Sequence, residues 1–307
     1  ESTSSSYTFS NLTSNATFYV KVYVKDSNNR ESSVSATSIA TKNRTLVDYV
    51  KSLYTGTQGA NNIYYHDSNL TNGAGDNSYR YAGASTDVNN YICLGSSETT
   101  CPEDNLYRII GVFGDNNHGI KDQQLVKVIK NTQIGYIAWN TTYSNNWANA
   151  SLNKTLNTTF KTEKLSGFED KIAEVTWRVS GYDANDDTAK TVYTGEITNA
   201  TKTHTAKIGL MYQSDYGYAA APHFWTTYLD EYDNANNKDW LYLSTREWLL
   251  SPSSVDGNAW YVAGNGAVIY LDNVTTNNNV VRPSFYLLSS VNFAGGNGTK
   301  NSPIRIN

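Results

Sequence analysis

Trp248-Leu249-Leu250-Ser251-Pro252 opens the stretch that decides the fold, and further apolar runs follow at 259–262, 267–271 and 280–287. Each run is short, rich in β-branched or aromatic residues, and bounded by Gly, Asn, Asp or Ser. This pattern is typical of consecutive antiparallel strands. Gly-Asn pairs between the runs provide turns because both residues tolerate positive φ. The stretch 248–288 therefore predicts a small sheet, with a core of Trp248, Trp260, Ile269, Phe285 and Leu287.

Three motifs in this stretch resemble a known family. They are Trp-Leu-Leu-Ser-Pro at 248–252, Ala-Trp-Tyr-Val at 259–262 and Val-Arg-Pro-Ser-Phe-Tyr-Leu at 281–287. Together they resemble the C-terminal half of the C-type-lectin-like domains related to formylglycine-generating enzymes, in the versions found in surface proteins of gut Firmicutes. The resemblance continues through 106–113 and 207–219, so it covers most of 60–307. It implies an α+β fold with small antiparallel sheets and one or two helices, while function varies within such folds.

The composition limits the class of protein. The chain has 307 residues, 39% of them apolar, with seven Trp and 24 Tyr, which is enough to form a core. Charged residues make up 17% and the net charge is -4, so the basic surface that nucleic-acid binding requires is not expected. No apolar run approaches the roughly 18 residues of a membrane span. The abundance of Asn, Thr, Ser and Tyr predicts an exported protein, extracellular or at the cell surface.

Residues 1–42 resemble the last strands of a fibronectin type III domain, an all-β fold. Phe18, Val20, Val22 and Val24 alternate with polar or amphipathic residues, which predicts one half-buried strand. Two or three strands with one apolar face are marginal alone. We therefore expect this face to be covered by upstream strands, by the main domain or by a neighbouring copy.

Three regions follow from these patterns. The fibronectin-like segment occupies 1–42 and the C-type-lectin-like domain occupies 59–307. Between them, apolar residues recur at helical spacing from Leu46 to Tyr54, so the connector 43–58 is expected to contain a short helix. That helix either packs on the neighbouring domain or sets the register of an assembly.

Cys93 and Cys101 flank a seven-residue polar loop. Two cysteines at this spacing fit a disulfide in an exported protein. A structural zinc site would need four ligands, and a redox motif would need Cys-x-x-Cys. The spacing therefore predicts a structural disulfide.

An acidic segment at 181–187 invites comparison with calcium loops. Asp183, Asn185 and Asp187 match the first three ligands of an EF-hand, but Thr188 and Thr194 stand where that loop needs Gly and Glu. A solvated acidic turn is the favoured interpretation, and an irregular Ca²⁺ site remains the alternative. The Glu-Pro-Asn and Gln-Pro-Asp motifs of calcium-dependent lectins do not occur. No cofactor or metal site is predicted.

Catalytic motifs are scarce in the sequence. His66, His118, His204 and His223 lie far apart without metal-ligand spacing. Ser251 does not lie in a Gly-x-Ser-x-Gly elbow. The formylglycine-generating relatives use cysteines late in the domain, whereas both cysteines here come early. The resemblance therefore carries no catalytic activity, and the chain is predicted not to be an enzyme.

The sequence favours a non-catalytic recognition or adhesion module of a bacterial surface protein, with a host or microbial glycan or protein as ligand. Loops at 251–258, 263–266 and 272–279 are expected at one edge of the domain. Tyr supplies contact area with few rotatable bonds, and Asn and Asp supply adaptable hydrogen bonds. The candidate ligand-binding residues are Asp256, Asn258, Tyr261, Asn265, Tyr270 and Asp272. Ordinary solvated turn residues are the alternative interpretation.

The alternative function is a structural subunit of an extracellular filament or pilus, assembled with neighbouring copies through residues 1–42.

Arg282 precedes Pro283 within an apolar run, and if it is buried it needs a carboxylate or carbonyl partner. We predict an internal bidentate ion pair for Arg282, with a surface arginine as the alternative.

Overall fold

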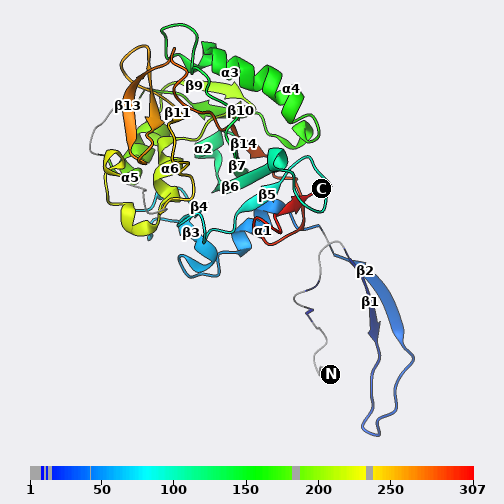
Figure 1. Ribbon diagram of the computed structural model, residues 1–307. Coiled ribbons are helices and arrows are strands. Elements are labelled where there is room, and N and C mark those ends of the chain that lie inside the picture. Colours follow the sequence, from blue (N-terminus) through cyan, green and yellow to red (C-terminus); the bar gives the residue numbers. More distant parts are fainter. Residues whose placement is uncertain (1–7, 10–11, 13–15, 42, 182–186, 233–237) are drawn as a thin grey trace. The chain divides into compact units, whose positions relative to one another are not determined.

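The computed structural model describes residues 8–9, 12, 16–41, 43–181, 187–232 and 238–307. The chain divides into two compact units, Glu1–Thr45 and Leu46–Asn307, and each is described by itself (Figure 1). The second unit combines helices with several antiparallel sheets, which confirms the mixed α+β class. No described helix is long and apolar enough to cross a membrane.

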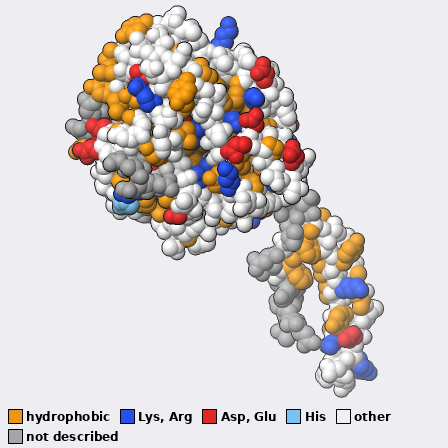
Figure 2. Space-filling view, in the orientation of Figure 1, with side chains coloured by type: hydrophobic (Ala, Val, Ile, Leu, Met, Phe, Trp, Pro, Cys, Tyr) orange, Lys and Arg blue, Asp and Glu red, His pale blue; other side chains and the backbone are white. Residues whose placement is uncertain are grey.

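The described part of the first unit is a β-hairpin. Strand β1 (Thr17–Val22) pairs with β2 (Ser35–Ala40) in a register that runs from Thr17 opposite Ala40 to Val22 opposite Ser35. The predicted alternation holds at Phe18 and Val20, which are half-buried, whereas Val22 and Val24 are 59% and 69% exposed. Hydrophobic side chains are visible along the hairpin in Figure 2. Tyr7, in the same fibronectin-like segment, lies outside the described residues.

A seven-stranded antiparallel sheet forms the centre of the second unit. Its order is β10-β14-β7-β6-β4-β3, with β5 paired to β6 (Figure 1). Strands β6 and β7 form a hairpin and are buried along their whole length, as expected for continuous apolar runs. The strands are β3 (Ile63–His66), β4 (Ser78–Tyr81), β5 (Tyr91–Cys93), β6 (Leu106–Phe113), β7 (Leu125–Lys130), β10 (Ile208–Gly209) and β14 (Ser284–Leu287).

Six α-helices occur among the described residues, more than the one or two expected. They are α1 (Leu46–Ser52), α2 (Asp115–His118), α3 (Ser151–Thr155), α4 (Lys161–Lys164), α5 (Ala189–Tyr193) and α6 (Gln213–Ala219). Most are single turns that sequence periodicity cannot reveal. Single 3-10 turns lie at 60–62, 103–105, 147–149, 169–171, 222–224 and 229–231.

The connector helix expected between 43 and 58 is α1. Leu46, Val47 and Val50 are buried, and α1 packs against β6 and β7. It therefore belongs to the core of the second unit. A longer helix follows later in the chain: α3, a π-helical turn at Leu156–Phe160 and α4 run on without a break. Leu152, Leu156 and Phe160, spaced four residues apart, are buried on one face of it.

The predicted single sheet over 248–288 is wrong in one respect. Strands β11 (Glu247–Pro252), β12 (Asn258–Val262) and β13 (Val268–Asn273) form a three-stranded sheet, but β14 pairs with β7 and β10 in the large sheet. The break falls at Val280–Pro283, where Pro283 has no N–H for a ladder and Arg282 turns inward to Glu247. The four apolar runs of 248–288 therefore contribute strands to two different sheets.

The tryptophan core is confirmed except at one position. Trp248, Trp260, Phe285 and Leu287 are buried, whereas Ile269 is half-buried and Val268 takes the core position. A shift in the pairing of β12 with β13 explains the difference. Ala259 lies opposite Asp272 but Tyr261 lies opposite Ile269, so β13 carries an extra residue near Leu271, whose φ is 69°. Such a bulge exchanges the faces of the residues on its two sides.

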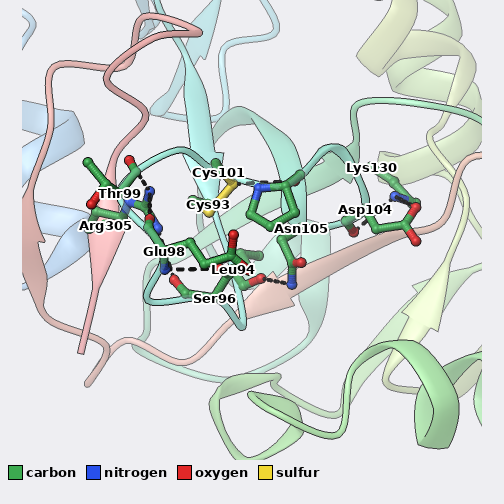
Figure 3. Close-up of a disulfide and its surroundings, with 11 residues drawn as sticks. Cys93, Leu94, Ser96, Glu98, Thr99, Cys101, Asp104, Asn105, Lys130 and Arg305 are labelled. Atoms are coloured by element: carbon green, nitrogen blue, oxygen red, sulfur yellow. Dashed lines mark hydrogen bonds and ion pairs between the residues drawn. A yellow bond between two sulfur atoms is a disulfide. The ribbon is translucent and has the colours of Figure 1, made fainter.

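The predicted disulfide joins Cys93 and Cys101. Figure 3 shows the loop that it closes, with Arg305 donating hydrogen bonds to the carbonyl oxygens of Ser96, Glu98 and Thr99. One guanidinium group thus fixes a loop that has no strand partner of its own. Two pairs of short strands complete the unit: β8 (Val175–Arg178) with β9 (Thr203–Ala206), and β15 (Phe293–Gly295) with β16 (Arg305–Ile306).

Candidate functional site

A polar groove lies between the helix of 151–164 and strand β9. Its volume is about 530 Å³, within the range of roughly 300–1,000 Å³ that small-ligand sites occupy. Figure 1 shows α3 and α4 lying over β9 and β10. The polar side chains that line this groove are Asn149, Asn153, Lys154, Asn157, Thr158, Lys161, Glu174, His204, Thr205 and Lys207.

Two asparagines and one histidine form the floor of the groove. The Asn153 amide nitrogen lies 2.9 Å from Nε2 of His204, and the Asn153 amide oxygen accepts a hydrogen bond from Asn157 Nδ2 at 2.9 Å. Since the amide oxygen is engaged by Asn157, the amide nitrogen donates to His204. Burial lowers the pKa of His204, so the ring is neutral near pH 7. A neutral ring that accepts at Nε2 carries its proton on Nδ1.

A π-helical turn sets the position of Asn157. Leu156–Phe160 interrupts the α-helical geometry, and such single turns occur often at functional sites. The Asn157 side chain accepts a hydrogen bond from the Ile208 N–H at 3.0 Å and donates to the Ile208 carbonyl oxygen at 2.9 Å. It therefore pairs with β10 as a backbone group would. The helix is fixed against the sheet edge, and the groove is preformed.

Positive charge prevails around the groove. Three lysines and one carboxylate, Glu174, line it, which gives a formal charge of +2 for the lining. Glu169 lies just outside, and its Oε1 is 3.2 Å from Lys161 Nζ and 3.4 Å from Lys207 Nζ. With Glu169 counted, three lysines face two carboxylates and the formal charge is +1, which favours a ligand with an anionic group.

A second hollow, of about 630 Å³, lies beside the disulfide. It is lined by Cys93, the loop Gly95–Thr99, Phe168 and the segment Arg305–Asn307, with Gly167 and Lys171. Its carbonyl oxygens at Ser96, Glu98 and Thr99 are already bound by Arg305. Arg305, the most extended polar side chain of this hollow, is held by those bonds, whereas three lysines line the groove over β9 around a fixed hydrogen-bonded set of amides, so that groove is the stronger candidate.

The loops expected at one edge lie at two opposite ends of the three-stranded sheet. Pro252 pairs with Ala259 and Asn258 pairs with Asn273, so the turn 253–257 and the segment 274–279 share one end. Val262 pairs with Glu247 and with Val268, which places 263–267 at the other end. Successive turns of an antiparallel meander always alternate in this way, so the expectation of a single edge is wrong.

Two of the predicted binding residues, Tyr261 and Asp272, join a charged cluster on the small sheet. Arg246 Nη2 donates to Asp272 Oδ2 at 2.6 Å, and the Arg246 guanidinium lies 4.3 Å from the centre of the Tyr261 ring. Asn279 donates to the same carboxylate oxygen and accepts from Arg246 Nε. These side chains satisfy one another, which favours a structural role for the cluster.

The other four predicted residues are spread over the sheet. Asp256 accepts the Gly257 N–H at 2.9 Å, and Asn265 accepts the Ala267 N–H at 3.2 Å, as turn residues commonly do. Asn258 is buried, and Tyr270 is half-buried with its ring 5.4 Å from that of Trp260. As ligand-binding residues, all six remain a prediction.

Of the acidic segment weighed as a calcium loop, Asp183 and Asn185 lie outside the described residues. Within the described ranges, no three His, Cys, Asp or Glu side chains form a group that could hold a metal ion. The groove itself was missed by sequence reasoning, which treated His204 as one isolated histidine. A usable signal was the pair Asn153 and Asn157, which lie four residues apart and hence on one helical face.

No protein-family model matches this chain, and neither the curated proteins nor the solved structures contain a match to it.

Proposed function

We propose that the chain is a non-catalytic extracellular recognition module that binds an acidic glycan in the groove over β9. The electropositive, preformed groove carries this proposal. Its amides and hydroxyls offer paired donors and acceptors of the kind that sugar hydroxyl groups require. Its lysines offer charge-assisted hydrogen bonds to a carboxylate or sulfate on the glycan. The resemblance to C-type-lectin-like domains and the disulfide support an exported binding module.

The lining of the groove supports recognition rather than catalysis. Glycoside hydrolysis uses two facing carboxyl groups, and Glu174 is the one carboxylate among the described lining residues. His204 carries its proton on Nδ1, and its Nε2 accepts the hydrogen bond from Asn153. A binding function needs nothing beyond these fixed donors and acceptors.

An array of acidic and neutral oligosaccharides tests the proposal. Wild-type protein should bind carboxylated or sulfated glycans above their neutral counterparts, and Lys154→Ala with Lys207→Ala should abolish that binding. The matched control is Asp256→Ala with Asn265→Ala, which changes two of the predicted loop residues. Binding that survives the lysine changes but is lost in this control would move the site to the small sheet. Binding to neither glycan class would overturn the proposal.

A filament or pilus subunit is the second candidate, and the exposed face of the β-hairpin favours it. Val22 on β1 and Ile39 on β2 are 59% and 52% exposed. Uncovered apolar strands of this kind are sites of pairing with another chain. Association of neighbouring copies through residues 1–42 would cover this face.

A further inference from the structure

A buried lysine and a buried aspartate meet in the core of the second unit. Lys127 lies on β7 and Asp215 lies in the first turn of α6, 88 residues further along the chain. Their side chains are 0% and 3% exposed, and Lys127 Nζ lies 2.5 Å from Asp215 Oδ2. An ion pair this deeply buried loses the hydration of both charges, so it gains little over neutral groups.

Aromatic rings enclose the pair and exclude water. The Lys127 nitrogen lies 4.3 Å from the centre of the Tyr212 ring, 5.2 Å from that of Trp177 and 5.3 Å from that of Tyr286. Both partners are held in place. Lys127 lies between β6 and β14 in the large sheet, and Asp215 Oδ2 accepts the Tyr212 N–H at 2.8 Å. An amine and a carboxyl group fixed in contact in a dry site have a high effective concentration for reaction.

A second buried carboxyl group lies beside the pair. Glu196, in a π-helical turn at Thr194–Thr198, accepts the Ser214 N–H at 2.8 Å and the Ser251 hydroxyl at 2.7 Å. Ser214 directly precedes Asp215, so Glu196 positions the backbone from which the aspartate side chain extends. Arg80, the other nearby cation, is 2.8 Å from Asp76 and has its own counter-charge.

The pKa shifts of Lys127 and Glu196 favour proton transfer in a reaction between the lysine and the aspartate. Burial lowers the pKa of Lys127, although Asp215 and Glu196 oppose this, and burial raises the pKa of Glu196 to about 7. A lysine that can lose its proton is a nucleophile. The charged or titratable groups that face Lys127 or Glu196, besides each other, are Arg80, Asp215, Tyr212 and Tyr286.

We propose that Lys127 and Asp215 condense spontaneously to an intramolecular amide bond. The nitrogen lone pair of Lys127 forms the new bond to Cγ of Asp215, and one carboxylate oxygen leaves. The ammonium group supplies the two hydrogens that release this oxygen as water, and the two opposite charges cancel. The remaining oxygen stays as the amide carbonyl and keeps the Tyr212 N–H. No oxidant or other reactant is needed, and the product ties the large sheet to α6 covalently.

The intact mass of the purified full chain tests this proposal. Denatured wild-type protein should weigh less than its disulfide-bonded sequence by one water, about 18 Da. Proteolysis should yield the peptide of Lys127 joined to the peptide of Asp215. Lys127→Met and Asp215→Ala should each restore the full mass. Asp215→Asn should still form the bond but release ammonia instead, with a loss of about 17 Da.

The role of Glu196 has a separate readout. Glu196→Gln should slow bond formation during refolding and remove its dependence on pH around neutrality, whereas a merely structural role would leave that pH profile in place. A wild-type chain with no loss of water in its intact mass, and with Lys127 and Asp215 recovered in unlinked peptides, overturns the proposal. The intact mass and the peptide map of the wild type give this result whether or not any variant folds.

Discussion

Arg282 and Glu247 form a bidentate ion pair in the interior, with Nε 2.7 Å from Oε1 and Nη2 2.8 Å from Oε2. Both side chains are almost completely buried, at 1% and 2% exposure. Arg282 Nη2 also donates to the carbonyl oxygen of Leu241. Because Glu247 begins β11 and Arg282 precedes β14, the pair connects the small sheet to the large one. The predicted internal partner of Arg282 is thereby confirmed.

Removal of one partner of this pair should destabilise the protein strongly. Glu247→Leu should lower the free energy of unfolding by about 3–5 kcal/mol, because it leaves Arg282 charged and buried without a counter-charge. The double change Glu247→Leu with Arg282→Met should cost less than either single change. Denaturant unfolding measures all three. Single changes that cost under about 1 kcal/mol would mean that the pair behaves as a surface ion pair.

The disulfide should stabilise the folded protein by reducing the conformational entropy of the unfolded chain. Closing the loop between Cys93 and Cys101 should contribute about 2–3 kcal/mol by restricting the unfolded state. Cys93→Ser with Cys101→Ser should lower the free energy of unfolding by this amount. Thiol titration of the native and denatured wild-type protein should find no free thiol. Two reactive thiols per chain would contradict the bond.

Burial raises the pKa of Glu196 from its ordinary value of 4.5 to about 7. Between these two values the folded protein holds a proton that the unfolded chain has released, so stability falls as the pH rises from about 4.5 to 7. Asp239 and Glu247 act in the same direction because burial raises the pKa of each, so the wild type alone cannot isolate Glu196. Melting temperatures of wild type and Glu196→Gln from pH 4.5 to 8 should therefore diverge. Parallel curves would refute the assignment.

The exposed hairpin makes the filament alternative testable by size. If neighbouring copies cover β1, the 1–307 chain should associate in sedimentation velocity, and Val22→Asp should release monomers by placing a charge on the apolar face. Lys21→Asp, on the opposite face of the same strand, is the matched control and should leave association unchanged. A wild-type protein that stays monomeric at high concentration would rule out this assembly.

The strand pattern in the sequence was sufficient for much of the fold. Short apolar runs predicted the three strands of the small sheet, and the spacing of two cysteines predicted the disulfide. The sequence did not show which sheet the strand at 284–287 joins, because its partner β7 lies more than 150 residues earlier in the chain. Local patterns identify strands but do not identify distant partners.

The groove shows why sites are harder to predict. Asn153, Asn157 and His204 come together only because a π-helical turn and β9 bring two distant segments into contact. Lys127, Asp215 and Glu196 likewise meet through β7, α6 and a second π-helical turn. Each of these residues alone resembles an ordinary surface residue in the sequence. Only the folded structure shows how far these residues are buried and which of them lie together.

The most direct test of the proposed recognition function is a map of backbone amide shifts. The isotope-labelled protein is titrated with the acidic oligosaccharide that binds best on the array, and amide resonances are followed by NMR. We expect the largest changes at residues 148–158 and 204–207, which line the two sides of the groove. Changes confined to 253–258 and 263–266, with the groove silent, would contradict the central claim that this chain binds its ligand over β9.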